Sequence, residues 1–178
     1  MRQLKVTELK KQLKTLDNKE LISIISEIYK ISPDAKKYLS VKFAGEDGVN
    51  DLYQEAKAKI KDEFFPDKGF GKLRLREAKN AINKFKKLTG DNRKVVDLTL
   101  FYVEKGVDFT NEYGDIDESF YDSMERAYAS VIRWCSEEED YYRYFADRLQ
   151  NVVINTDGLG WGFHDGLSDI YYSLPWVE

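Results

Sequence analysis

The hydrophobic positions of this chain recur at helical spacing along nearly its whole length. Leu21, Ile24 and Ile28 are three or four residues apart, which places them on one face of a helix. Just before them, Asp17 and Glu20 have the spacing of a capping box, in which each side chain bonds the backbone of the other residue. The pattern therefore predicts a helix that begins just after Asp17.

Proline, glycine and capping residues mark the other predicted boundaries. Ser32 and Pro33 have the pattern of an N-cap followed by a first-turn proline. Gly106 is expected to end one helix, and Ser136 with Glu139 to open another as a second capping box. The expected helices besides the one after Asp17 span about residues 7–16, 33–45, 52–64, 73–88, 91–105, 117–135, 136–155 and 163–174.

These eight or nine helices predict an all-α fold of stacked antiparallel hairpins, because short loops join helices that lie side by side. No strand-like alternation persists, and no residue signature repeats along the chain. An irregular helical domain and a helical-repeat array therefore both stay open. We expect a single domain over residues 1–178, with a possible subdivision into 1–66 and 73–178 at the loop 67–72.

Charge changes this picture, because the two halves of the chain have opposite sign. Residues 1–94 hold 23 Lys and Arg against 14 Asp and Glu, whereas residues 95–178 hold 5 against 18. Such asymmetry indicates electrostatic partners, and it also permits the two halves to associate head to tail between copies. It identifies no reaction.

The basic residues concentrate on the helix predicted over 73–88. Leu75, Ile82 and Phe85 share one arc of it, and the opposite arc is basic and polar. A stripe of this kind can follow phosphates, but a solvated helix face is the commoner reading, and no nucleic-acid-binding signature accompanies it. The candidate binding residues on the stripe are Arg76, Lys79, Asn83, Lys84, Lys86 and Lys87.

The acidic half is rich in aromatic residues, which form either a wide core or an interface. Tyr141 and Tyr142 lie with other aromatic residues within two turns of a predicted helix, and Trp161 lies in a glycine-rich turn. Tyrosine and tryptophan combine apolar area with a polar tip, which suits protein interfaces. We take Tyr141, Tyr142 and Trp161 as candidate contacts to a partner.

Two segments hold residues that could carry chemistry. Asp115 and Asp117 begin a calcium-loop pattern that fails further on, since Phe120 and Arg126 stand where the loop needs Gly and Glu. They are candidate metal ligands, although a solvated helix start explains them as well.

The second segment contains the chain's single histidine. His164 is followed by Asp165, with Asp169 about one turn further on, so His164 is a candidate general base oriented by an aspartate. Helix capping and core packing explain the segment equally, and we assign no cofactor. Cys135 is more simply a small core residue than a nucleophile.

Several stretches of the chain form recognisable motifs: residues 7–39 with Lys-Glu-Leu-Ile at their centre, Glu-Phe-Phe-Pro at 63–66, Phe-Thr-Asn-Glu-Tyr-Gly-Asp-Ile at 109–116, Phe-Tyr-Asp-Ser-Met-Glu-Arg at 120–126 and Gly-Trp-Gly-Phe-His-Asp at 160–165. In these stretches the chain resembles a family of small, all-helical bacterial proteins of unknown function. The resemblance implies a helical, bacterial, cytosolic protein and assigns no activity. The chain also has no apolar run resembling a signal peptide or a membrane span, which again predicts a cytoplasmic location.

Three functional hypotheses follow. The first is a non-enzymatic interaction module that binds a protein partner or a second copy of itself, with no role at a membrane. The second is a nucleic-acid-associated protein that uses residues 72–94. The third is a metal-dependent hydrolase that gathers the Asp115 and His164 segments into one site.

The second hypothesis predicts nucleic-acid binding that weakens steeply as salt rises, because bound cations displace condensed counterions. Electrophoretic mobility of a nucleic-acid fragment, measured with the protein at low and at moderate salt, tests it. Unchanged mobility at low salt would reject the hypothesis.

Overall fold

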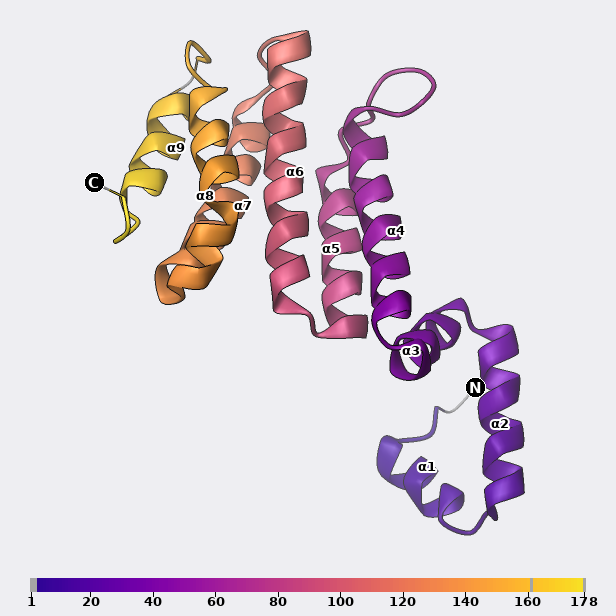
Figure 1. Ribbon diagram of the computed structural model, residues 1–178. Coiled ribbons are helices and arrows are strands. Elements are labelled where there is room, and N and C mark those ends of the chain that lie inside the picture. Colours follow the sequence, from indigo (N-terminus) through magenta and orange to yellow (C-terminus); the bar gives the residue numbers. More distant parts are fainter. Residues whose placement is uncertain (1–2, 161, 178) are drawn as a thin grey trace. The chain divides into compact units, whose positions relative to one another are not determined.

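The computed structural model describes residues 3–160 and 162–177, and in this part of the chain it is all-helical with no strand (Figure 1). This confirms the predicted fold class. The helices are α1 (Val6–Leu13), α2 (Asn18–Ile31), α3 (Pro33–Ala44), α4 (Glu46–Phe64), α5 (Leu75–Thr89), α6 (Asn92–Tyr113), α7 (Glu118–Glu137), α8 (Glu139–Ile154) and α9 (Phe163–Tyr172).

The chain divides into two compact units, residues 1–49 and 50–178. The division falls within α4, and the loop 67–72 lies inside the second unit. The expectation of a single domain with a possible subdivision at that loop stays a prediction.

In the first unit, the predicted helix signals form as expected. Asp17 and Glu20 make a reciprocal capping box at the start of α2, with both bonds at 2.8 Å. Ser32 caps α3, where its hydroxyl accepts from the Ala35 amide at 3.2 Å, and Pro33 is the first helical residue. The helices α2 and α3 pack against each other. No residue described in α1, α2 or α3 is buried, so this unit has no closed core of its own in these helices.

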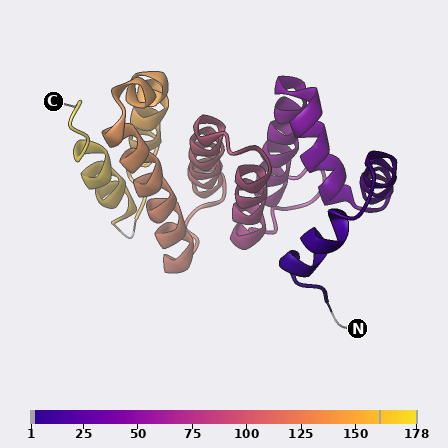
Figure 2. The ribbon, with the colours of Figure 1, turned by 90° about the horizontal axis from the view of Figure 1, so that it is seen from below.

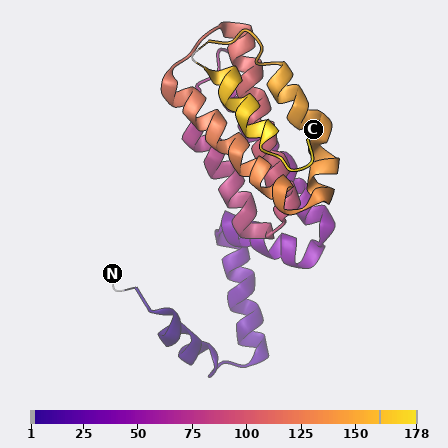
Figure 3. The ribbon, with the colours of Figure 1, turned by 90° about the vertical axis from the view of Figure 1, so that its left-hand side faces the viewer.

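In the second unit, successive helices from α5 to α9 run in opposite directions (Figure 1), as the hairpin prediction requires. Helix α6 packs against α5, α7 and α8, and α9 closes the far side against α7 and α8. Figures 2 and 3 show α6 to α9 from two further directions, with α9 beside both of the helices it contacts. The unit has an aromatic core in which the rings of Tyr102 and Tyr128 are fully buried.

The predicted end of a helix at Gly106 is wrong. Helix α6 continues to Tyr113, and Gly106 is buried within it. A β-carbon at Gly106 would lie 2.2 Å from Met124 Sδ, on α7. The glycine is therefore a packing position that lets α7 approach α6, rather than a helix terminator.

The predicted capping box at Ser136 is also wrong. Helix α7 extends to Glu137, and the Ser136 hydroxyl donates back to the Ile132 carbonyl at 2.9 Å. The N-cap of α8 is Glu138, which makes no side-chain capping bond. A serine can bond the preceding helical turn instead of opening a new one, and the spacing of residues alone does not distinguish these two states.

A charged cluster joins three helices of the second unit. The Arg148 guanidinium on α8 donates to Asp97 at 2.6 Å and to both oxygens of Glu104 at 2.7 and 2.8 Å, both acids being on α6. Tyr53 on α4 donates to the other oxygen of Asp97 at 3.0 Å. Burial opposes the charge of Arg148, but the hydrogen bonds that it donates to its two acidic partners leave its pKa raised. Burial, and then Asp97, raise the pKa of Tyr53.

The Arg148→Met substitution is expected to lower the free energy of unfolding by about 2 kcal/mol, because it leaves two half-buried carboxylates without their cation. Chemical denaturation measures the change. Arg143→Met is the matched control on the same helix, since Arg143 pairs with Glu139 on the exposed surface, where an ion pair contributes at most about 1 kcal/mol. Equal losses in the two variants would contradict the structural role of Arg148.

The Gly106→Ala substitution is expected to cost about 1 kcal/mol of stability, because the added methyl group displaces the buried Met124 side chain. Denaturation of Gly106→Ala, Met124→Ala and the double variant forms a double-mutant cycle. In the Met124→Ala background the alanine at 106 should be neutral or stabilising. An unchanged penalty there would show that Met124 is not the cause.

Candidate functional site

The basic stripe lies on α5, with its apolar arc turned inward as predicted. Ala78, Ile82 and Phe85 are buried. The candidate residues fall into two groups: Arg76, Lys79, Asn83, Lys86 and Lys87 are exposed, and Lys84 is half-buried. Lys79 is drawn to the neighbouring helix α7, where its ammonium donates to the Ser123 hydroxyl at 3.1 Å. The stripe is therefore exposed apart from Lys84, and Lys79 also contacts the neighbouring helix.

The aromatic candidates of α8 belong partly to the core. Tyr141 and Tyr142 are half-buried, and the Tyr141 ring lies 6.1 Å from Trp134 and 6.5 Å from Phe145 between centroids. Burial, followed by the charge of Glu138, raises the pKa of Tyr141. Their predicted role in partner binding stays a prediction, and Trp161 lies outside the described residues.

The two candidate metal ligands have separate structural roles. Asp117 caps α7, where it accepts from the Phe120 amide at 2.9 Å, and hydrogen bonds from Ser119 and Phe120 lower its pKa. Asp115 accepts from the Tyr121 hydroxyl at 3.0 Å. Capping and loop anchoring therefore account for both carboxylates.

His164 is held by two hydroxyl groups. Thr156 Oγ1 donates to the Val153 carbonyl at 2.7 Å, so at 3.1 Å it accepts from Nδ1–H of His164. The other ring nitrogen, Nε2, lies 3.5 Å from the Ser168 hydroxyl. Among the described residues, neither Asp165 nor Asp169 hydrogen-bonds the imidazole, and both are exposed. A catalytic role for His164, Asp165 and Asp169 stays a prediction.

The structure brings the Asp115 and His164 segments close to one another, and a metal-ligand role for Asp115 and Asp117 stays a prediction. Asn111 donates to the Asn155 carbonyl at 2.7 Å, and the ring of Tyr121 lies 4.7 Å from that of Phe163. Over the described residues, no group of three or more His, Cys, Asp or Glu is arranged to hold a metal ion. Burial raises the pKa of Cys135 to about 11, so its thiol is protonated at neutral pH and is a poor nucleophile.

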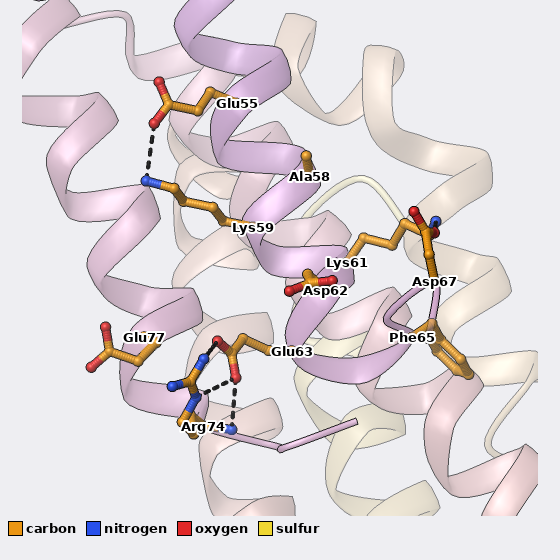
Figure 4. A pocket seen from close by; sticks show the side chains of 10 residues that line it. All are labelled: Glu55, Ala58, Lys59, Lys61, Asp62, Glu63, Phe65, Asp67, Arg74 and Glu77. Atoms are coloured by element: carbon orange, nitrogen blue, oxygen red, sulfur yellow. Dashed lines mark hydrogen bonds and ion pairs between the residues drawn. The ribbon is translucent and has the colours of Figure 1, made fainter. Parts of the chain in front are cut away.

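A surface hollow of about 560 Å³ lies beside α4 and the start of α5 (Figure 4). Glu63 is buried, and its carboxylate accepts from the Arg74 guanidinium at 2.7 and 3.0 Å and thereby anchors the start of α5. Other pairs at the rim join Glu55 to Lys59 and Lys61 to Asp67. Each of the three cations in this hollow pairs with a carboxylate, and Asp62 and Glu77 make its lining acidic overall, which favours a structural role over anion binding.

A second surface feature is apolar and lies within the first unit. A groove of about 630 Å³ runs between α2 and α3, and Ile25, Tyr29, Leu39 and Phe43 contribute its apolar walls. The sequence analysis found the apolar spacing of α2 but did not identify an exposed surface. Periodicity shows which residues share a face and does not show whether another element covers that face.

Fold and surface together define an all-helical protein with an exposed apolar groove and, within the described residues, no assembled metal site. No described helix has both the length and the apolar character needed to cross a bilayer. The chain belongs to the family of unknown function DUF6155, whose family model matches residues 4–172. No curated protein and no solved structure matches the chain. The family assignment agrees with the resemblance, whereas bacterial origin and cytoplasmic location stay predictions.

Proposed function

We propose that this protein is a non-enzymatic interaction module that binds an amphipathic helix of a partner protein in the groove between α2 and α3. The observation that carries the proposal is the concentration of exposed apolar side chains in the first unit. Of the seventeen large hydrophobic residues that are exposed in the described chain, eleven lie between residues 4 and 43. Exposed apolar surface gathered in this way is typical of protein interfaces.

The strongest exposure lies along α2 and α3 themselves. Ile31 is 79% exposed and Phe43 is 82% exposed, and Phe43 contributes to the groove. Helix α2 has 14 residues and is therefore about 21 Å long. A helix of similar length, with hydrophobic residues three and four apart, would present a complementary stripe to such a groove.

The charged residues at the groove indicate which charges the partner helix should carry on either side of its apolar stripe. Lys30 is the charged residue among those that line the groove. Nζ of Lys36 lies 5.7 Å from the centre of the Tyr29 ring, at the same site. Because these charges are positive, we expect acidic residues beside the apolar stripe of the bound helix.

The remaining hypotheses have less support. Lys84 of the basic stripe on α5 is half-buried, and no nucleic-acid-binding signature accompanies the stripe, which weakens the case for a continuous phosphate track. The hydrolase hypothesis gains no support from the arrangement of Asp115, Asp117 and His164, each of which has its own hydroxyl or capping partners.

The Phe43→Glu substitution is expected to weaken binding of an acidic amphipathic helix at least about tenfold, because it places a like charge in the groove and removes an aromatic contact. The probe is a fluorescently labelled helical peptide of Leu, Ala and Glu, measured by polarisation with the full chain. A peptide with Lys in place of Glu should bind the unmodified protein more weakly than the acidic one.

The matched control is Phe70→Glu, since Phe70 is equally exposed at 82% but lies in the loop before α5. It should leave peptide binding unchanged, and both variants should keep the helical circular dichroism of the parent. Equal binding of the acidic and basic peptides, or no binding of either, would contradict the proposal. Sedimentation that shows a dimer, lost in Phe43→Glu, would instead identify a second copy as the occupant.

A further inference from the structure

The cavity between α5, α6 and α7 contains hydrogen-bond donors and a lysine that, over the described part of the chain, has no carboxylate partner. It measures about 380 Å³, which is within the range of small-ligand sites. Its polar wall consists of residues from all three helices: Lys79 and Asn83 on α5, Thr99 and Tyr102 on α6, and Ser119, Asp122, Ser123, Arg126 and Ser130 on α7. We propose that this cavity binds a phosphate monoester, with the phosphoryl group on Lys79 and the Ser123–Tyr102 pair.

At the buried end of the cavity are two hydroxyl groups, and one of their two hydrogens has no acceptor among the described residues. Tyr102 is fully buried and Ser123 is buried, and their oxygens lie 2.8 Å apart. One of the two hydroxyl hydrogens makes this bond, whichever residue donates it. Since the Lys79 ammonium donates to Ser123, it takes up neither of these hydrogens. No further acceptor for them is found among the described residues, so one O–H group is left to donate to a ligand oxygen.

Charge selects an anion as that ligand. Among the described residues, no carboxylate forms an ion pair with Lys79, and its bond to Ser123 uses one of three N–H donors. At the rim, Arg126 pairs with Asp122 at 2.6 Å and keeps further N–H donors. The walls thus carry two cations against one carboxylate. This contrasts with the hollow of Figure 4, where Glu63 neutralises Arg74.

A phosphoryl group fits this donor set better than a spherical anion does. It offers several oxygens at fixed angles, and these can accept from the ammonium and the spare hydroxyl hydrogen together. The remaining wall includes the side chains of Ile82 and Ala127 beside the hydroxyls of Thr99 and Ser130. Such a wall suits a small polar organic group attached to the phosphate. This site lies entirely in the second unit, so it is independent of the groove between α2 and α3.

The Lys79→Met substitution is expected to weaken phosphate binding at least about tenfold, because it removes the ammonium and keeps an aliphatic side chain. The probes are inorganic phosphate and glycerol phosphate, titrated by calorimetry into the full chain at constant pH and ionic strength. Thermal unfolding gives a second readout, since a ligand that binds only the folded state raises the midpoint. Sodium chloride at matched ionic strength should produce no such rise.

The matched control is Lys86→Met, because Lys86 is an exposed lysine of the same helix that does not line the cavity. It should bind both probes as the parent does, and Tyr102→Phe should weaken binding without changing the charge. If Lys79→Met and Lys86→Met weakened phosphate binding equally, the binding would come from the general positive charge of α5 and the proposal would be overturned. Absence of heat and of any midpoint shift with either probe would also overturn it.

Discussion

The Arg148 cluster links three helices of the second unit through charged hydrogen bonds. One guanidinium on α8 bonds two carboxylates that are two turns apart on α6, and one of these carboxylates also receives the hydroxyl of Tyr53 from α4. Planar geometry makes these bonds directional, so the cluster fixes the rotation of α8 about its axis as well as its distance from α6. The neighbouring contact of Gly106 with Met124 sets the approach of α7 in the same way. Helix α6 also packs against α5 and α7, the two helices that line the 380 Å³ cavity with it.

Local chemistry explains which parts of the fold the sequence could predict. The cap of α2 by Asp17 and Glu20 and the cap of α3 by Ser32 involve residues three apart, and they form as expected. Gly106 and Ser136 mislead because their roles depend on other turns or helices. A glycine that ends a helix and a glycine that admits a side chain from a neighbour are identical in a single sequence.

The candidate sites show the same limit more strongly. Residue types and spacing identified Lys79 as part of a basic stripe, but its partner Ser123 is 44 positions away and could not be inferred without the packing of α5 against α7. Sequence reasoning placed His164 beside an aspartate, whereas the folded chain surrounds it with Thr156 and Ser168. Adjacency along a helix separates side chains by about 100°, so the next residue is rarely the functional neighbour.

The absence of buried residues in α1, α2 and α3 has an energetic consequence. Opening these helices exposes little apolar surface that is not already exposed, so their local unfolding has a small heat-capacity change and a weak dependence on denaturant. Amide hydrogens there exchange through local fluctuations at a lower free energy than those of the α6 core. Any molecule that covers this surface adds its binding free energy directly to that local stability. The helices of the first unit are therefore expected to be more ordered when a partner is bound to them. The measured affinity for that partner then includes the free-energy cost of ordering these helices.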